Sequence, residues 1–544
     1  MLMVRSERVN FLKKYIMRNK KNIVIGLLSM ILFSLITTPL SLIIGRTVDM
    51  LSSTNRSYIQ LLQFILVILS IHVISILLSY IYQMCFSKVQ QRINKEIKAD
   101  LLKIVFNAPL SILEKFDKGY LVSRIDESQQ ISSLLSPVNL SSLIGIFNIF
   151  FSFILMFIVN SKLALVSMLI IPICFVISFK STNKIQSGAT EIQEASGKVS
   201  GSIFEDFNRI ENIKILNIQK TRVKNLTNKM DKLFKRTICQ TRYLISYLQL
   251  FSLTNSSITV FILGISGFLI LRDEMTIGGY TTFSLYLSQM LPAIQGLSNI
   301  SITLKPTIII IDRVLELFLL PNENMGMKTI ESINTISFSN VSFKYSNQSQ
   351  LVLNRINLSI RLGDKVLIKG KNGTGKSTIL KLILGIYNVT SGEIKINGIL
   401  NTELDKINLR SKIGMVSQNI ELYKGTILEN ILYGCETSTK ENVFSIVEKC
   451  NLKNYFENFP KNLNTELSDL GNGVSGGQAQ VIAFLRALIG EKELLIFDEA
   501  TSNVDMKTRQ LIFEVIEKNY FSKTILIVSH SDEKLPFINK TIQL

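Results

Sequence analysis

The stretch GKNGTGKS, at Gly370–Ser377, decides the fold of the second half of this 544-residue chain. It follows a short apolar run, KVLIK at Lys365–Lys369, and it precedes a helical pattern over Ser377–Leu384. In a glycine-rich loop between a buried strand and a helix, backbone N–H groups and the helix N-terminus converge on one point and bind phosphate oxygens. We therefore predict a P-loop, and a simple glycine turn is the alternative interpretation.

The loop supplies the groups that a nucleotide phosphate needs. Lys376 is long enough to reach the β- and γ-phosphates, and the hydroxyl of Ser377 is a ligand for Mg²⁺. The cofactors expected from this pattern are ATP and Mg²⁺. The predicted nucleotide-binding residues of the loop are Gly370, Asn372, Gly373, Thr374, Gly375, Lys376, Ser377 and Thr378.

Two later apolar runs end in polar side chains that suit phosphate hydrolysis. Leu494–Phe497 is followed by Asp498 and Glu499, and Ile525–Val528 is followed two residues on by His530. We predict that Asp498 holds the metal, that Glu499 polarises the attacking water, and that His530 contacts the γ-phosphate and this water. Solvation of a strand end and a structural histidine are the respective alternatives. Strands alternate with helices throughout residues 335–544, so this segment is predicted to be an α/β domain.

The N-terminal half is built differently, and its apolar character raises the mean hydropathy of the chain to +0.31. It contains stretches without Asp, Glu, Lys or Arg that are long enough to cross a bilayer, which takes ~20 helical residues. Buried helices of a soluble protein are the alternative, but they rarely run so far without a charge. The six predicted spans lie near 22–45, 57–87, 134–160, 163–179, 243–271 and 279–304.

These patterns together predict a multi-domain membrane protein. An all-α transmembrane domain of six helices occupies residues 1–318, a linker residues 319–334, and the α/β domain residues 335–544. Lys and Arg are concentrated before the first span and in the connections that follow the second and fourth spans. The chain is thus predicted to be a multi-pass protein of the cell membrane, with a bacterial plasma membrane expected. The positive-inside rule places its N-terminus and its α/β domain in the cytoplasm.

The net charge of +19 also raises the possibility of nucleic-acid binding. Because the basic residues are concentrated where membrane topology requires them, we expect membrane lipid and no nucleic acid as a partner. The five cysteines lack metal-ligand spacing and are read as reduced. The two long basic connections carry apolar residues at helical spacing, so the membrane helices are expected to continue beyond the spans. The chain is expected to turn between Pro109 and Gly119 and again within Asn208–Ile213, in short helices that rest on the nucleotide-binding half.

With these motifs in one order, the chain resembles the ATP-binding cassette (ABC) exporters over essentially its whole length. Tyr345 in VSFKY is similar to the aromatic residue that stacks on adenine, and Gln418 in MVSQN to the glutamine that senses Mg²⁺ and couples to the membrane half. Asp505 in SNVD is similar to the D-loop aspartate. The resemblance implies a catalytic role for Glu499, His530 and Gln418. It also implies a metal site at Ser377, Gln418 and Asp498.

The segment VSGGQ is similar to the family signature, which Ser475, Gly476, Gly477 and Gln478 match. In this family the signature of one cassette completes the ATP site of another. The resemblance therefore implies that this chain is a half-transporter that works as a dimer; a homodimer is favoured and a heterodimer is the alternative. Val474, Val481 and Asn503 depart from the family pattern without removing a phosphate-, metal- or water-handling group. The end of the chain at Leu544 is expected to leave out the family's closing segment.

The function implied is export of an amphipathic substrate across the cell membrane, driven by ATP hydrolysis and by alternating access of the dimer. A peptide or bacteriocin is the favoured cargo, because the short form of the chain resembles exporters of that kind. With no cysteine-protease segment before the first span, we expect that this chain does not cleave its cargo. The first alternative is a multidrug or lipid exporter or flippase. A non-transport ABC ATPase and an ATP-gated channel or sensor are further alternatives from other classes.

Overall fold

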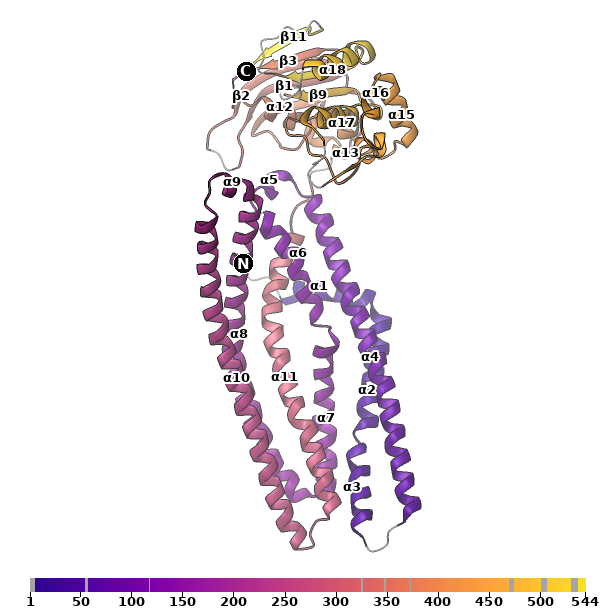
Figure 1. The fold of residues 1–544 in the computed structure, drawn as a ribbon, viewed down its shortest axis with the longest axis vertical. Helices are drawn as coiled ribbons and strands as arrows, with labels where there is room; N and C mark the ends of the chain where they lie inside the picture. Colours follow the sequence, from indigo (N-terminus) through magenta and orange to yellow (C-terminus); the bar gives the residue numbers. More distant parts are fainter. Residues whose placement is uncertain are drawn as a thin grey trace. The chain divides into compact units, whose positions relative to one another are not determined.

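The structure, a computed structural model, describes residues 5–53, 57–116, 118–323, 326–346, 349–371, 373–468, 474–499, 506–529 and 537–544. The chain divides into two compact units (Figure 1). The first is helical and comprises Met1–Phe106 and Phe116–Leu320; the second comprises Asn107–Lys115 and Pro321–Leu544. The short segment Asn107–Lys115 is thus grouped with the second unit, although residues on both sides of it belong to the first.

The first unit consists of helices joined by short turns. Their bounds are α1 Arg5–Arg18, α2 Lys20–Thr37, α3 Leu40–Ser52, α4 Tyr58–Phe106, α6 Lys118–Ser133, α7 Pro137–Val159, α8 Ser161–Asn208, α9 Ile210–Ile215, α10 Gln219–Leu271 and α11 Ile277–Phe318. Each predicted span falls on one of these helices, except that the first is divided between α2 and α3.

Several helices are much longer than a bilayer is thick. The helices α4, α8 and α10 contain 49, 48 and 53 residues. At 1.5 Å per residue they are about 70–80 Å long, against a hydrocarbon core of about 30 Å. The prediction that the membrane helices continue into the long connections is therefore confirmed. The turns also lie as expected, with α5 (Leu110–Leu113) between Pro109 and Gly119 and α9 directly after Arg209.

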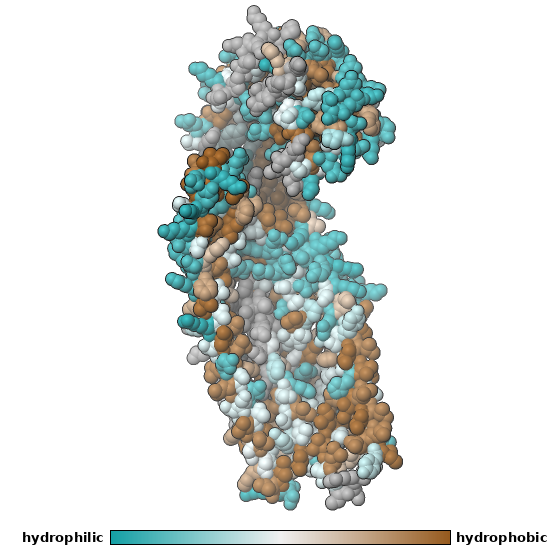
Figure 2. All heavy atoms as spheres, in the orientation of Figure 1, coloured by the Kyte–Doolittle hydropathy of each residue, from teal (hydrophilic) through white to brown (hydrophobic). Residues whose placement is uncertain are grey.

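Apolar surface supports the membrane assignment. Among the described residues, four helical segments are long and apolar enough to cross a membrane: Lys20–Ser52, Tyr58–Phe106, Gly119–Val159 and Gln219–Leu271. Ile59, Leu62 and Leu69 of α4 are exposed, and Figure 2 shows hydrophobic residues gathered on the surface of this unit. The predicted spans 163–179 and 279–304 lie on α8 and α11, where many side chains fall outside the described set. The number of crossings stays a prediction.

The second unit is built on two sheets. The order of the five-stranded parallel sheet is β11-β3-β10-β9-β6, with β11 Lys540–Gln543, β3 Lys365–Lys369, β10 Thr524–Val528, β9 Leu494–Asp498 and β6 Ile413–Val416. The order of the antiparallel sheet is β2-β1-β4-β5, with β2 Leu353–Arg361, β1 Thr335–Phe343, β4 Ser391–Ile396 and β5 Ile399–Leu400. A short ribbon pairs β7 Gly425–Thr426 with β8 Glu466–Leu467.

Helices accompany the parallel sheet, as expected of an α/β domain. They are α12 Lys376–Ile383, α13 Lys406–Ser411, α14 Ile427–Leu432, α15 Lys440–Lys449, α16 Lys453–Glu457, α17 Gly476–Leu488 and α18 Met506–Asn519, with 3₁₀ turns at Asn401–Glu403 and Asn462–Asn464. The strands predicted at Lys365–Lys369, Leu494–Phe497 and Ile525–Val528 are observed to within one residue. The predicted helix Ser377–Leu384 begins and ends one residue earlier.

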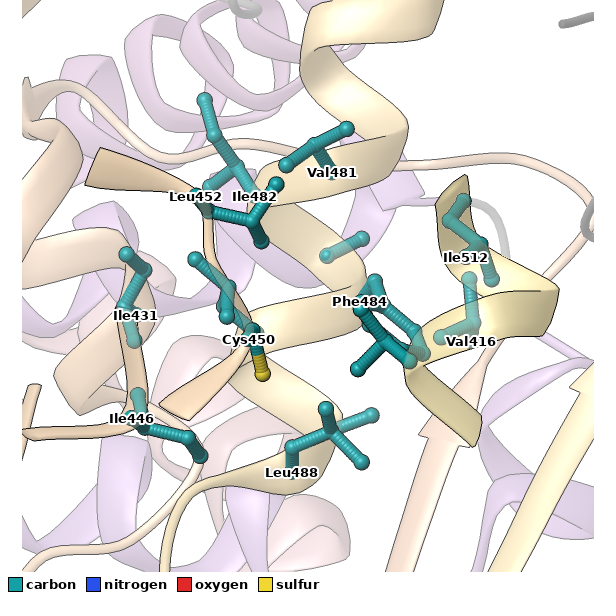
Figure 3. Packing of buried hydrophobic residues seen from close by; sticks show 14 of the residues in the cluster. Val416, Ile431, Ile446, Cys450, Leu452, Val481, Ile482, Phe484, Leu488 and Ile512 are labelled. Carbon is teal, nitrogen blue, oxygen red and sulfur yellow. The ribbon is translucent and has the colours of Figure 1, made fainter. Parts of the chain in front are cut away.

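One buried cluster fixes the position of α17, the helix that follows the signature segment. Val481, Ile482 and Phe484 of α17 are buried in it, together with Ile431 of α14 and Val416 of β6 (Figure 3). Val481 is completely shielded from solvent. A charged side chain at this depth would require an ion partner, so the departure from the family pattern at this position is compatible with the apolar core that this chain builds.

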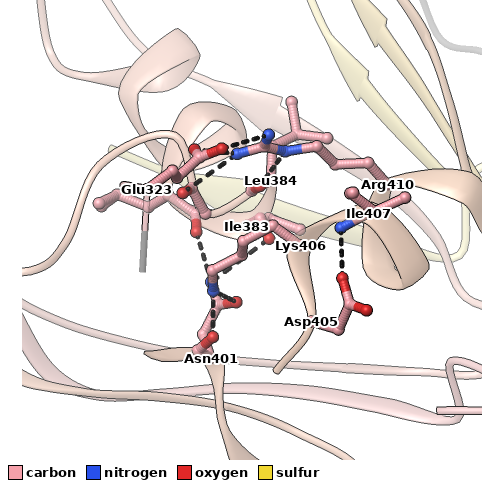
Figure 4. A network of polar contacts seen from close by, with 10 residues as sticks. Glu323, Ile383, Leu384, Asn401, Asp405, Lys406, Ile407 and Arg410 are labelled. Carbon is pink, nitrogen blue, oxygen red and sulfur yellow. Dashed lines mark hydrogen bonds and ion pairs between the residues drawn. The ribbon is translucent and has the colours of Figure 1, made fainter. Parts of the chain in front are cut away.

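The start of the second unit is held by polar contacts. Arg410 of α13 forms a two-pronged ion pair with Glu323 and also donates 3.0 Å to the carbonyl of Leu384 (Figure 4). Beside it, the ammonium of Lys406 is buried and donates to the backbone and side-chain oxygens of Asn401. Burial, reinforced by the nearby charge of Arg410, lowers the pKa of Lys406 to about 8. The ion pair joins Glu323 to the body of the second unit.

Candidate nucleotide site

The register of the parallel sheet brings the predicted site residues to one edge. Val528 of β10 pairs with Ile368 of β3 on one side and with Asp498 of β9 on the other. Phe497 of β9 pairs with Val416 at the end of β6. All these strands run in the same direction, so the segments that follow their carboxyl ends emerge side by side. Ligands of open α/β sheets bind at this edge.

The loop after β3 has the backbone conformation of a phosphate cradle. Gly373 and Gly375 have φ of +83° and +92°, values that residues with a Cβ adopt only with strain. Gly375 precedes α12, whose first residue is the buried Lys376. The ammonium of Lys376 donates to the carbonyls of Gly370 at 2.8 Å and Lys371 at 3.1 Å. These bonds hold the cation at the loop, where it can meet an anionic oxygen together with the N-terminus of α12.

The predicted metal ligands Ser377 and Asp498 are brought together from α12 and β9. The hydroxyl of Ser377 donates to Oδ1 of Asp498 over 3.1 Å. Asp498 is buried, and burial raises the pKa of its carboxyl, an effect increased by the neighbouring Glu499 and opposed by the bond from Ser377. A buried carboxylate beside a hydroxyl is a fitting donor set for a hard cation, which would relieve the cost of burying the charge.

Gln418 and Glu499 form the second contact between predicted site residues. The side-chain amide of Gln418, two residues after β6, donates to Oε2 of Glu499 over 2.6 Å. Glu499 has a φ of +48°, in the left-handed region, and its backbone N–H donates to the carbonyl of Val528 at 3.1 Å. Such backbone strain in a residue other than glycine clusters at functional sites. The side chain predicted to polarise water is therefore directed by a strained backbone and by an amide from a neighbouring strand.

An aromatic group lies close to the phosphate loop. The hydroxyl of Tyr345 lies 3.0 Å from the hydroxyl of Thr378 in α12, and its ring packs edge-on against Phe343 and Tyr387 at centroid distances of 5.0 and 5.3 Å. Tyr345 is half-buried, so part of its ring remains accessible to a planar base. Lys381 lies 5.9 Å from the centroid of this ring.

The signature segment begins another helix, α17, and not the helix that carries the phosphate loop. Ser475 is the N-cap: its hydroxyl accepts from the N–H of Gln478 at 3.3 Å, and the Gln478 amide oxygen accepts from the N–H of Ser475 at 2.8 Å. This capping box fixes the first turn, and Gly476 there is exposed. The structure thus presents Ser475, Gly476 and Gly477 at an open helix N-terminus suited to an anion. The predicted residues Asn372, Asp505 and His530 lie outside the described residues.

One element of the site was missed by the sequence analysis. Asn430 of α14 is fully buried and bonds to the backbone of Tyr423 in both directions, at 2.9 and 2.8 Å. Arg486 of α17 donates to the Asn430 backbone and side-chain oxygens and to the carbonyl of Glu421. Together they fix the loop that starts at Gln418. The signal in the sequence is the pairing of an asparagine soon after this loop with an arginine in an otherwise apolar helix.

Comparison with known proteins agrees with this geometry. The family model of the ABC transporter transmembrane region matches residues 23–294, and the model described as ABC transporter matches residues 353–502. The chain is an ABC transporter. In this ABC transporter the first match covers the helices from α2 into α11, and the second covers the phosphate loop, the signature and the Asp498–Glu499 pair. It is a multi-pass membrane protein with an ATP-binding domain.

Relatives and a solved structure extend the comparison. The transport/processing ATP-binding protein ComA of Streptococcus pneumoniae is 29% identical over 465 residues, which are 85% of this chain and 64% of that protein. The lactococcin-A transport/processing ATP-binding protein LcnC of Lactococcus lactis is 28% identical over 84% of this chain and 65% of that protein. This ABC transporter therefore spans less than two thirds of the length of both relatives. An ATP-dependent lipid A-core flippase of Desulfotalea psychrophila is 26% identical over 86% of this chain and 82% of that protein.

The fold of the transporter matches that of a bacterial Atm1-family ABC exporter with ATP bound. The TM-score is 0.83 at 19% sequence identity, and the match covers 94% of this chain and 91% of that chain. An exporter fold, with a helical transmembrane domain followed by an α/β ATPase domain, is thus the fold class, as the sequence predicted.

Proposed function

We propose that this chain is one half of a dimeric exporter that hydrolyses ATP to move an amphipathic peptide out of the cell. The observation that supports it most is that one sheet edge gathers Lys376, Ser377, Asp498 and Glu499 with Gln418, in a chain that also carries long apolar helices. Lysine for phosphate, hydroxyl and carboxylate for a cation, and a second carboxylate for water are the parts that phosphoryl transfer to water needs.

The chemistry assigned to each residue follows from its position. Lys376 and the N–H groups of the loop bind and orient the phosphates, and the accessible ring of Tyr345 stacks on the base. Ser377 and Asp498 would hold Mg²⁺ with Gln418, and this ion, when bound, would neutralise charge on the phosphate oxygens. Glu499 accepts the proton of the attacking water, and the Gln418 amide orients its carboxylate. His530, in the role proposed from the sequence, contacts the γ-phosphate.

A dimer follows from the arrangement of the helix N-termini. Each chain has one phosphate loop at α12 and one signature N-terminus at α17, and Ser475 is exposed. We propose that Ser475, Gly476, Gly477 and Gln478 bind the γ-phosphate held by the loop of a second chain, with Asp505 between the two sites. Since one chain supplies every hydrolytic group, a homodimer with two working sites is the proposed assembly. The N-terminus and the ATPase domain are proposed to lie on the cytoplasmic side, where ATP is.

The cargo proposal has two candidates. A peptide of the bacteriocin type is supported by the similarity to the lactococcin-A transport/processing protein of Lactococcus and to the transport/processing protein ComA of Streptococcus. A lipid is the second candidate, because the lipid A-core flippase is matched over 82% of its length, more than either transport/processing protein. The polar side chains Asn148 and Gln249 among apolar neighbours in the predicted spans are compatible with both amphipathic classes.

Reconstitution in liposomes tests the proposal. With ATP and Mg²⁺ we expect uptake of a fluorescent bacteriocin-type peptide into vesicles whose ATPase domains face outward, and faster ATP hydrolysis when the peptide is present. The Lys376→Ala protein is the control and is expected to do neither. Translocation of labelled lipid without peptide uptake would replace the cargo assignment, and peptide-independent ion conductance would reject export.

A further inference from the structure

The first predicted span is interrupted where its two halves pack on different partners. Helix α2 ends at Thr37 and α3 begins at Leu40, because Pro39 has no N–H to continue the hydrogen-bond ladder and its ring opposes a straight helix. The first half packs on α4, where a Cβ on Gly26 would lie 2.9 Å from the ring of Phe86. The second half packs mainly on α11, the helix of the sixth predicted span, and touches α4 less extensively.

The contact between α3 and α11 is a continuous polar seam, in contrast to the apolar surfaces around it. Its residues recur every three or four positions and so face one another along both helices. We define the seam as Thr38, Ser41, Gly45 and Asp49 against Gly278, Thr282, Tyr286 and Gln289. Most of these residues are buried, namely Ser41, Gly45, Gly278, Thr282 and Tyr286, whereas Asp49 is half-buried.

The two backbones touch at the centre of the seam. A Cβ on Gly45 would lie 1.8 Å from Oγ1 of Thr282, and a Cβ on Gly278 would lie 2.0 Å from the carbonyl oxygen of Gly45. Neither position can carry a side chain while the helices stay in contact. Small residues that allow this approach are typical of helix pairs in membranes.

Hydrogen bonds close the seam along its length. Tyr286 donates to the carbonyl of Thr38 at 2.9 Å, and Gln289 donates to the hydroxyl of Ser41 at 3.2 Å. The carbonyl of Thr38 lies at the break between α2 and α3, so the bond from Tyr286 links the seam to this break.

At the outer end, Asp49 caps α11 from the neighbouring helix. Its Oδ1 accepts from the backbone N–H of Gly278 at 2.7 Å, and its Oδ2 accepts from the hydroxyl of Thr276 at 2.9 Å. A carboxylate on a helix N-terminus is favourable because it satisfies an unpaired N–H and opposes the helix dipole. These two bonds lie at the end of the seam where water can replace them, whereas the bond of Tyr286 is buried. The seam can therefore open from this end.

We propose that the α3–α11 seam is the outer gate of the export path and that Asp49 is the positioning residue that keeps it closed. This rests on the proposed function, since it needs a path that opens on the outer face. In the closed state α3 lies against α11; to open, α3 swings at the Thr38–Pro39 break while α2 stays on α4. As the gate opens, the carboxylate of Asp49 exchanges its two protein donors for water.

The test measures whether Ser41, buried in the seam, becomes accessible. Ser41→Cys is introduced into the full-length chain after each of the five native cysteines is replaced by alanine. The protein is reconstituted and its reaction with a membrane-impermeant maleimide on the outer side is timed, without nucleotide and with ATP and vanadate. Asp49→Asn is then added, which removes the charge and retains the size. Asp273→Asn, at another acidic residue outside the seam near the start of α11, is the matched control.

We expect slow labelling without nucleotide and faster labelling with ATP and vanadate. Asp49→Asn is expected to speed labelling roughly tenfold without nucleotide, the effect of losing a hydrogen bond to a charged group. Asp273→Asn should leave the rate unchanged. Equal rates for Asp49→Asn and its parent, or for both aspartate variants, overturn the gate. The nucleotide-free comparison does not depend on hydrolysis. A protein without ATPase activity would therefore refute the proposed function, whereas the labelling rates of the two aspartate variants would still test the role of Asp49.

Discussion

The hydroxyl of Tyr387 donates a 2.5 Å hydrogen bond to Oε1 of Glu114, which lies in the short segment between α4 and α6. The same Tyr387 ring packs at 88° against Tyr345, the residue proposed to stack on adenine. Burial and the bond to Glu114 raise the pKa of Tyr387, so the phenol stays a neutral donor at physiological pH. One side chain thus contacts both the base-binding ring and a segment that follows the long helix α4 and precedes α6 of the membrane unit.

Tyr387→Phe should therefore weaken coupling more than nucleotide binding. The ring and its packing on Tyr345 remain, whereas the bond to Glu114 is lost, and a bond to a charged group corresponds to about tenfold in a docking equilibrium. We expect the affinity for ATP to change less than about twofold and the stimulation of ATPase activity by cargo to be largely lost. Fluorescent-nucleotide binding and ATPase assays with and without peptide measure the two effects.

Tyr433→Phe is the matched control, since Tyr433 is an exposed tyrosine of the same unit. It should retain both binding and stimulation. Glu114→Gln keeps an acceptor of the same length and should fall between the two tyrosine variants. Full stimulation in Tyr387→Phe would show that the hydrogen bond has no part in coupling.

Glu499→Gln tests the proposed base. The amide still fills the position and can still contact Gln418, but it cannot accept the proton of water. General-base catalysis contributes about 10²–10⁴-fold, so turnover should fall by at least about a hundredfold while nucleotide binding is retained. Phosphate release and fluorescent-nucleotide binding are the measurements. Glu491→Gln, at an exposed residue shortly before β9, should leave turnover unchanged, and hydrolysis at the normal rate in Glu499→Gln would remove that residue from its role.

The sequence predicted the parts of this protein whose pattern is local. The apolar run Lys365–Lys369 and the following glycines predict β3 and the loop, because buried strands and left-handed turns leave a direct mark on composition. The proximity of Ser377 to Asp498 could also be expected, since Asp498 ends one strand, Ser377 follows another, and the two strands would be parallel in such a sheet.

Features that depend on pairing over long distances were not predicted. The contact of Asp49 with Gly278 joins residues more than two hundred positions apart, and neither residue is unusual by itself. The division of the first span at Pro39 was missed because the charge-free stretch is continuous there, and composition averages over a break. Asn430 was missed because its importance comes from the backbone groups it meets in the folded protein.

Asp498→Asn should change stability in a pH-dependent way. Burial raises the pKa of the Asp498 carboxyl above its ordinary value of 3.8, so the folded protein binds this proton more tightly than the unfolded chain does. The stabilisation from the protonated form is fully present below 3.8 and is lost as the pH rises through the folded-state pKa. Without metal, the neutral amide should therefore raise the melting temperature of the ATPase unit at pH 8, and the gain should shrink as the pH falls toward 4.

Calorimetry in EDTA measures this difference, with Asp405→Asn as the comparison at a half-buried helix cap. The same Asp498→Asn protein should lose the Mg²⁺-dependent part of its affinity for ATP. A gain in melting temperature that is independent of pH would contradict the assignment to charge burial, and unchanged Mg²⁺ dependence would remove Asp498 from the proposed metal site.

Asn430→Ala should loosen the loop that carries Gln418. The substitution leaves the backbone N–H and carbonyl of Tyr423 and Nη2 of Arg486 without their side-chain partner, which costs about 1–3 kcal/mol in unfolding free energy for each unsatisfied group. We expect a destabilisation of about 2–4 kcal/mol, since water relieves part of this at the more exposed Tyr423. Turnover should fall because the contact of Gln418 with Glu499 depends on this loop, whereas ATP should still bind.

Asn454→Ala, at an exposed residue of α16, should change stability by less than about 0.5 kcal/mol. Chemical unfolding and phosphate release on both variants decide the matter: an Asn430→Ala protein as stable and as active as Asn454→Ala would mean that Arg486 alone orders the loop.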